Sequence, residues 1–169
     1  MDLAFFANLA EIVGTVAIVI SLIYVGIQVN DSTRAVRSST ANETTSAISA
    51  WYSDIGNNQQ SAELFAKGLV DPESLSSGEL AQYMYLAHGI ILQFQAAYYL
   101  SEEGTLDLEL RKSITNNLAG VRELPGFLLY WSQRGSLFKP SFREFVDDVL
   151  VNSATNTDFE NLYRSGDSD

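Results

Sequence analysis

The stretch from Ile12 to Val29 most constrains what this chain can fold into, because its eighteen residues carry no charged side chain. A membrane's hydrocarbon core needs about 20 apolar helical residues, and Leu9 and Ala10 extend the run to that length. A buried core helix is the alternative, but the helices of soluble proteins seldom stay uncharged for so long. The stretch therefore predicts a transmembrane helix.

The residues that flank this stretch predict its fate and its orientation. Asp2 and Glu11 precede it, where a cleaved signal peptide carries lysines, and no small-residue cleavage site follows it, so we expect it to be retained. Arg34 and Arg37 follow it closely, and basic residues favour the cytoplasmic side. Arg34 and Arg37 are thus the expected topology-determining residues, with the N-terminus outside and the rest of the chain in the cytoplasm.

The predicted span has two different faces on a helical wheel. Small and polar residues share a sector of about 100°, and aliphatic residues occupy the opposite side. Because Gly14, Ser21 and Gln28 are seven apart, one seam can follow a left-handed helix pair or ring. We expect self-association through a helix–helix interface of Gly14, Ala17, Ser21, Tyr24 and Gln28. The alternative is a homo-oligomeric pore lined by the Gly14/Ser21/Gln28 stripe, with Glu11 at its outer mouth.

The rest of the chain predicts an all-α protein, in which the anchor continues into a cytoplasmic helical bundle of about five further helices. No segment alternates polar and apolar residues with a period of two, so no sheet is expected. The expected divisions are 1–29 for the tail and transmembrane helix, 30–56 for a helical extension, 57–153 for the cytoplasmic domain and 154–169 for an acidic, disordered tail.

Turn and cap residues place the helices of this domain. Helices are expected over about 59–67, 77–104, 106–118 and 125–133, with a last one after Pro140. Gly68 is expected to cap the first of these helices. Ser76 and Glu79 have the spacing of a capping box, as do Ser141 and Glu144. Gly89, in the middle of the longest helix, suggests either a close approach by another helix or a bend, and we expect the close approach.

The composition excludes several function classes. A net charge of −11 argues against nucleic-acid binding, and the lack of cysteine excludes disulfides, thiolate metal sites and cysteine nucleophiles. His88 is the only histidine, and its apolar helix predicts a packed core residue. Acidic residues cluster at 102–103 and 144–148, which we interpret as solvated faces. The chain is expected to be no enzyme and to hold no cofactor or metal. Its many aromatic residues favour a core over a ligand pocket.

Three segments carry a resemblance to a known group. They are EIVGTVAIVISLIYVGIQVN, FQAAYYLSEEGTLD and PGFLLYWSQRGSLFKPSFREFV. The pattern resembles uncharacterised bacterial inner-membrane proteins with one N-terminal transmembrane helix and a small helical cytoplasmic domain, a domain of unknown function. The resemblance implies a single-pass protein of the bacterial inner membrane, and it implies no activity.

Together these observations predict a membrane-anchored helical interaction or scaffold protein. Its expected partners are the lipid bilayer, further copies of itself as a homo-oligomer and an unidentified protein, and no nucleic acid.

Overall fold

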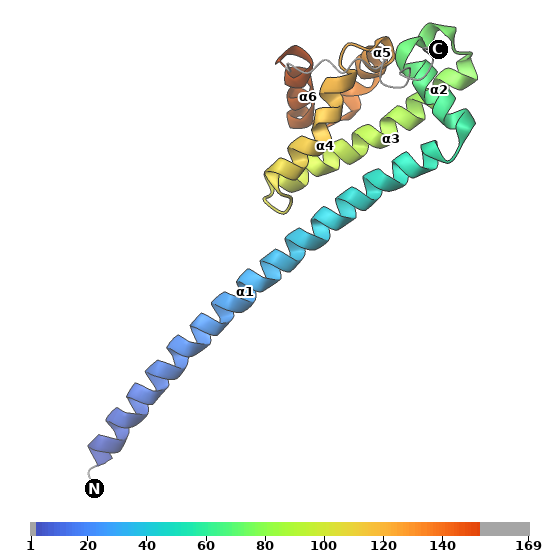
Figure 1. The fold of residues 1–169 in the computed structure, drawn as a ribbon. Coiled ribbons are helices and arrows are strands. Elements are labelled where there is room, and N and C mark those ends of the chain that lie inside the picture. Colours follow the sequence, from blue (N-terminus) through green and yellow to red (C-terminus); the bar gives the residue numbers. More distant parts are fainter. Residues whose placement is uncertain (1–2, 153–169) are drawn as a thin grey trace, which may run out of the picture. The chain divides into compact units, whose positions relative to one another are not determined.

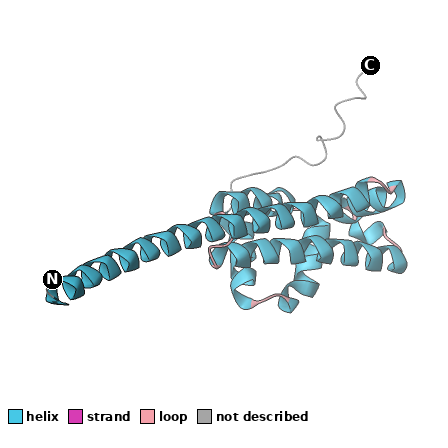
Figure 2. Ribbon diagram, turned by 90° about the horizontal axis from the view of Figure 1, so that it is seen from below, coloured by secondary structure: helices cyan, strands magenta, loops and turns pink. Residues whose placement is uncertain are grey.

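The computed structural model describes residues 3–152, and every regular element in that range is a helix (Figures 1 and 2). The predicted all-α fold is confirmed, and five α-helices follow the long first one in the described range. The elements are α1 (Leu3–Gly56), α2 (Gln59–Val70), η1 (Pro72–Ser74), α3 (Ser77–Glu102), α4 (Leu108–Val121), α5 (Pro125–Arg134), η2 (Gly135–Leu137) and α6 (Pro140–Asn152), where η1 and η2 are 3-10 helices. The predicted tail 154–169 lies outside the described residues.

Two compact units make up the chain, Met1–Ser39 and Thr40–Asp169. Helix α1 contributes to both, because it runs unbroken from Leu3 to Gly56. The predicted extension over 30–56 therefore belongs to the same helix as the predicted span. Gly56 ends it, and a turn at Asn57 and Asn58 leads into α2, as expected from the sequence.

The core of the second unit is built around α3, which packs against α2, α4 and α5, while α6 packs against α4 (Figure 1). One apolar face of α3 is buried, and it includes Tyr83, Ile90 and Phe94. The opposite face stays open, and it exposes Tyr85 and Leu92. The largest completely buried side chains are Tyr83, Leu118, Tyr130, Phe142 and Val146.

The last turns of α1 join this core through Trp51. Its indole Nε1 donates a hydrogen bond of 3.1 Å to the backbone carbonyl of Leu86 on α3. The indole also lies beside Gly89, where an added Cβ would sit 3.5 Å from Nε1. Gly89 therefore meets the side chain of Trp51 at an ordinary van der Waals distance, which is looser than the close helix approach predicted there.

Side chains and glycine define most helix ends of this unit. Ser76 and Glu79 form the predicted capping box at the start of α3. Asp107 accepts hydrogen bonds from two backbone N–H groups at the start of α4. Gly104 follows α3 with φ +74°, a conformation that glycine adopts without strain.

Gly68 does not cap α2, so this prediction is wrong. The helix continues to Val70, and Gly68 is buried against the ring of Tyr83. A Cβ added to Gly68 would lie 2.6 Å from the Cγ of Tyr83. The residue is a glycine because Tyr83 fills the space of a side chain. Gly126 of α5 packs on the same turn, where its Cβ would overlap the carbonyl oxygen of Gly68 and lie 2.7 Å from the Cα of Leu69.

The second predicted capping box is also wrong. Helix α6 begins at Pro140, so Ser141 lies inside it, and the first helical bond runs from Arg143 N to the carbonyl of Lys139. The hydroxyl of Ser141 shares a hydrogen bond of 2.7 Å with that of Tyr99 instead. The predicted start of α4 is two residues early, because the Asp107 cap sets the start at Leu108.

Candidate functional site

The predicted interface residues of α1 all lie in the first unit and are all exposed, so the described structure leaves that face open. At Gly14 an added Cβ would meet no heavy atom within 4 Å. The aliphatic side is exposed as well, with between half and two thirds of each side chain accessible at Ile12, Val16, Val19, Leu22, Ile23 and Ile27. Each face is therefore free to meet lipid or another helix.

The polar groups of this face find partners within α1. The hydroxyl of Ser21 donates to the carbonyl of Ala17 at 2.8 Å, and Nε2 of Gln28 donates to the phenol oxygen of Tyr24 at 3.2 Å. Since hydrocarbon offers no hydrogen bonds, these contacts lower the cost of placing Ser21 and Gln28 in a membrane. The amide oxygen of Gln28 accepts no bond from any described residue, so Gln28 has most to gain from a partner helix.

One helix of the described chain is long and apolar enough to cross a membrane. It lies in α1, where the most apolar window of 18 residues has a mean hydropathy of 2.3 and none of it is buried. Burial inside the protein would have explained such a window as a core helix. That explanation does not apply here. Arg34 and Arg37 follow the window as exposed residues of the same helix.

His88 is half-buried at the edge of the aromatic core, whereas the sequence predicted a packed core residue. Its Nδ1 and the phenol oxygen of Tyr130 are 2.8 Å apart, and its ring packs near Phe138. Tyr130 is completely buried, and burial raises the pKa of its phenol above the ordinary value, as it does at Tyr83. No described hydrogen bond or ion pair joins His88 to a carboxylate, so the described structure gives it no partner for acid–base catalysis.

The predicted acidic clusters are solvent-exposed. Glu102 forms an ion pair of 2.9 Å with Arg111, whose guanidinium also lies over the ring of Tyr98, and Asp147 accepts a hydrogen bond from the indole of Trp131. Within residues 3–152 no group of three His, Cys, Asp or Glu side chains is arranged to hold a metal ion. Glu102 and Asp147 make structural contacts with their neighbours.

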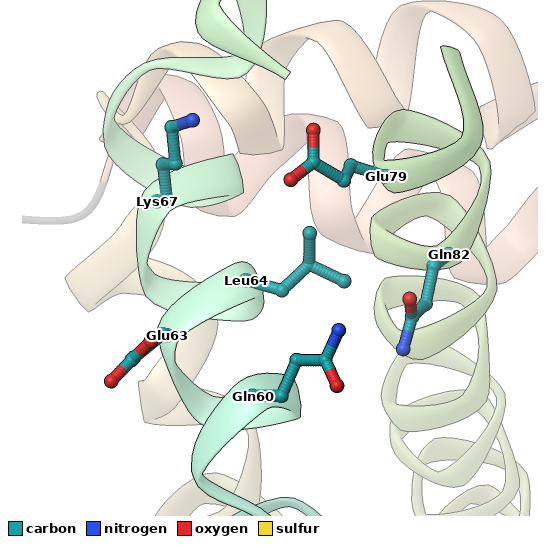
Figure 3. Close-up of a pocket in the computed structure, with 6 residues that line it drawn as sticks. All are labelled: Gln60, Glu63, Leu64, Lys67, Glu79 and Gln82. Carbon is teal, nitrogen blue, oxygen red and sulfur yellow. The ribbon is translucent and has the colours of Figure 1, made fainter. Parts of the chain in front are cut away.

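A cleft of about 170 Å³ lies between α2 and α3 (Figure 3). Its floor is Leu64, and its other lining residues are polar: Gln60, Glu63 and Lys67 from α2, and Glu79 and Gln82 from α3. Sequence reasoning missed this cleft. The spacing of Gln60, Glu63, Leu64 and Lys67 puts them on one side of α2, but only the packing of α2 beside α3 shows that this side faces Glu79 and Gln82.

Comparison of the chain with models of protein families, with curated proteins and with solved structures finds no match. A functional assignment therefore rests on the residues and on their geometry.

Proposed function

We propose that the chain is a single-pass membrane protein that self-associates through α1 and presents its helical domain as an interaction or scaffold module. The proposed location is the bacterial inner membrane, with the N-terminus outside and the second unit in the cytoplasm. The proposed partners are the lipid bilayer, further copies of the chain and a protein bound by the helical domain.

The observation that carries this proposal is the contrast between the two parts of the chain. The apolar window of α1 has no burial, whereas residues 40–152 build a core of their own with completely buried Tyr83, Leu118 and Phe142. Apolar surface of this extent is costly in water and stable in hydrocarbon. An anchor beside an independently packed domain explains both features.

Packing at small residues supports self-association through the face with Gly14, Ala17, Ser21, Tyr24 and Gln28. In a lipid environment, helices associate by close packing at small residues and by hydrogen bonds between polar side chains. The exposed Gly14 permits close approach, and Gln28 retains hydrogen-bonding capacity after its contact with Tyr24. The intrahelical bonds of Ser21 and Gln28 favour a packed interface over a water-filled pore.

A matched pair of glycine substitutions tests the interface. Gly14 belongs to the proposed face, whereas Gly26 lies on the opposite side of the same helix, and both have open surroundings. We expect Gly14→Leu to shift the full-length protein in detergent micelles toward monomer by about tenfold in dissociation constant, and Gly26→Leu to leave it unchanged. Sedimentation equilibrium at several protein concentrations measures both.

Two results would contradict this proposal. A wild-type protein that is monomeric at every concentration would contradict self-association. An equal effect of Gly14→Leu and Gly26→Leu would contradict the proposed interface. Ion flux into liposomes that is present in the wild-type protein and lost in Gln28→Leu would support the pore over the packed interface.

A further inference from the structure

The cleft between α2 and α3 combines features that the proposed membrane anchor does not use. Its volume of about 170 Å³ is smaller than that of the usual pocket for a drug-sized ligand and suits an occupant about the size of a single amino acid. The cleft is open to solvent, because all its lining residues except Leu64 are exposed. Its floor is the buried, apolar Leu64, and its walls are polar. A ligand that fits must therefore combine a short apolar portion with polar groups.

The two charges at one end of the cleft have opposite signs and stand on opposite helices. Lys67 comes from α2 and the Glu79 carboxylate points toward it from α3 (Figure 3). No ion pair joins them in the described chain, and the Lys67 ammonium donates to the backbone carbonyl of Ser74 at 3.2 Å. One oxygen of the solvent-exposed Glu79 carboxylate accepts a bond of 2.8 Å from the Ser76 N–H, and the side chain of Ser76 also interacts with this carboxylate.

Two amides line the other end of the cleft. Gln60 and Gln82 extend into it from α2 and α3, and neither amide has a hydrogen-bond partner among the described residues (Figure 3). Each amide offers both donors and an acceptor. Glu63 points away from α3, and its carboxylate accepts a bond of 2.7 Å from Gln59. The cleft therefore presents one cation, one anion and neutral amides.

We propose that this cleft binds a free α-amino acid, with its carboxylate held by Lys67 and its ammonium group held by Glu79. A dipolar ion of this kind satisfies both charges without a net change in the charge of the site. The amides of Gln60 and Gln82 complete the hydrogen bonds of the bound molecule, and Leu64 contacts an apolar side chain. This binding needs no membrane and no second copy of the chain.

The test uses three ligands and the full-length protein in detergent micelles. L-leucine carries both charges, leucinamide lacks the carboxylate, and N-acetyl-L-leucine lacks the ammonium group. Isothermal titration calorimetry should show saturable binding of L-leucine, with each analogue at least about tenfold weaker because one charged contact is lost.

Two variants assign the charges to their residues. In Lys67→Gln, L-leucine and leucinamide should bind with equal affinity, because the partner of the carboxylate is gone. In Glu79→Gln, L-leucine and N-acetyl-L-leucine should bind equally, and glutamine keeps the capping geometry of the helix start. Lys112→Gln, which removes an exposed lysine that pairs with Glu109 on α4, should change nothing.

The proposal fails if L-leucine gives no saturable heat with the wild-type protein. It fails also if both analogue preferences survive in Lys67→Gln and Glu79→Gln. Thermal unfolding of each variant, followed by circular dichroism, shows that the folded domain is being compared.

Discussion

Tyr83 and Tyr130 place two phenol groups in the same apolar core, with different outcomes. Both side chains are completely buried. The hydroxyl of Tyr130 has a partner in His88, whereas the hydroxyl of Tyr83 has none among the described residues. A buried hydroxyl without a partner carries its full desolvation cost, so Tyr83 contributes through its ring and not through its oxygen.

Replacement of Tyr83 by phenylalanine should therefore leave the protein as stable as before or raise its free energy of unfolding by about 1 kcal/mol. Tyr130→Phe should lower it by about 1 kcal/mol, because the bond to His88 is lost. Urea denaturation followed by tryptophan fluorescence measures both, since Trp51 and Trp131 belong to the second unit. A loss at Tyr83→Phe as large as at Tyr130→Phe would contradict this account of the core.

Gly126 has no room for a methyl group. Its Cβ would overlap the backbone of Gly68 and Leu69, and backbone atoms yield less readily than the end of a side chain. Gly126→Ala should lower the free energy of unfolding by about 3 kcal/mol through overpacking. Gly78 in the first turn of α3 is the matched control, because an added Cβ there meets no atom within 4 Å. Gly78→Ala should be neutral or slightly stabilising. Equal losses would show that α2 and α5 do not meet as described.

At the scale of the element, the start of α3 depends on a charged cap. The hydrogen bonds of Ser76 hold the pKa of the Glu79 carboxyl below its ordinary value, with a smaller contribution from the charge of Lys67. Because the folded-state pKa is the lower one, the unfolded chain binds more protons in acid. This contribution to stability is present above the unfolded pKa of about 4.3 and is lost as the pH falls through the folded value.

Glu79→Gln should therefore flatten the acid limb of the stability curve. Its free energy of unfolding should lie below that of the wild-type protein at pH 7, and the difference should shrink as the pH falls below about 4. Urea denaturation at a series of pH values measures the two curves, and curves that stay parallel down to pH 3 would show that Glu79 does not titrate with folding. Glu109→Gln, on the exposed ion pair with Lys112, is the control.

Helix α1 has two parts with different surroundings in the described structure. Its apolar window has no buried residue, yet its last turns contribute Trp51 and the buried Ile55 to the core of the second unit. The intervening segment is rich in serine and threonine, which have modest helix propensity. Packing at the C-terminal end and hydrocarbon around the apolar stretch would stabilise the helix from both ends.

At the scale of the whole molecule, the proposed membrane anchor makes the side on which the helical domain lies a testable property. Arg34 and Arg37 predict the cytoplasm. Single cysteines introduced at Ser39 and at Asn58 should then resist an impermeant maleimide in intact cells and react after the membrane is opened. The chain has no cysteine of its own, so the labelling has no background. Labelling of both positions in intact cells would reverse the proposed orientation.

The same experiment tests the two arginines directly. Replacing Arg34 and Arg37 by glutamate should raise the fraction of molecules labelled from outside, because the positive bias is removed. Replacing Arg122 and Arg134 by glutamine, far along the chain from the apolar window, should leave the labelling unchanged. An unchanged pattern after the first replacement would mean that other features set the topology.

The sequence by itself was enough to predict what depends on neighbours along the chain. Helical periodicity, the cap of Ser76 with Glu79 and the uncharged run before Asn30 all arise within one or two helical turns, so their physical causes are visible in the order of residues. The last helix, predicted after Pro140, follows the same rule, because its buried residues Phe142 and Val146 lie one turn apart.

Only the tertiary structure decided what depends on residues distant in the chain. In the sequence Gly68 resembles a helix cap, but in the structure Tyr83 and Gly126 occupy the space beside it. Ser141 also resembles a cap, but its hydroxyl shares a hydrogen bond with Tyr99. The cleft exists because α2 packs beside α3 and brings Lys67 opposite Glu79. A side chain's role is set by the atoms that surround it, and in a helical bundle most of these come from other helices.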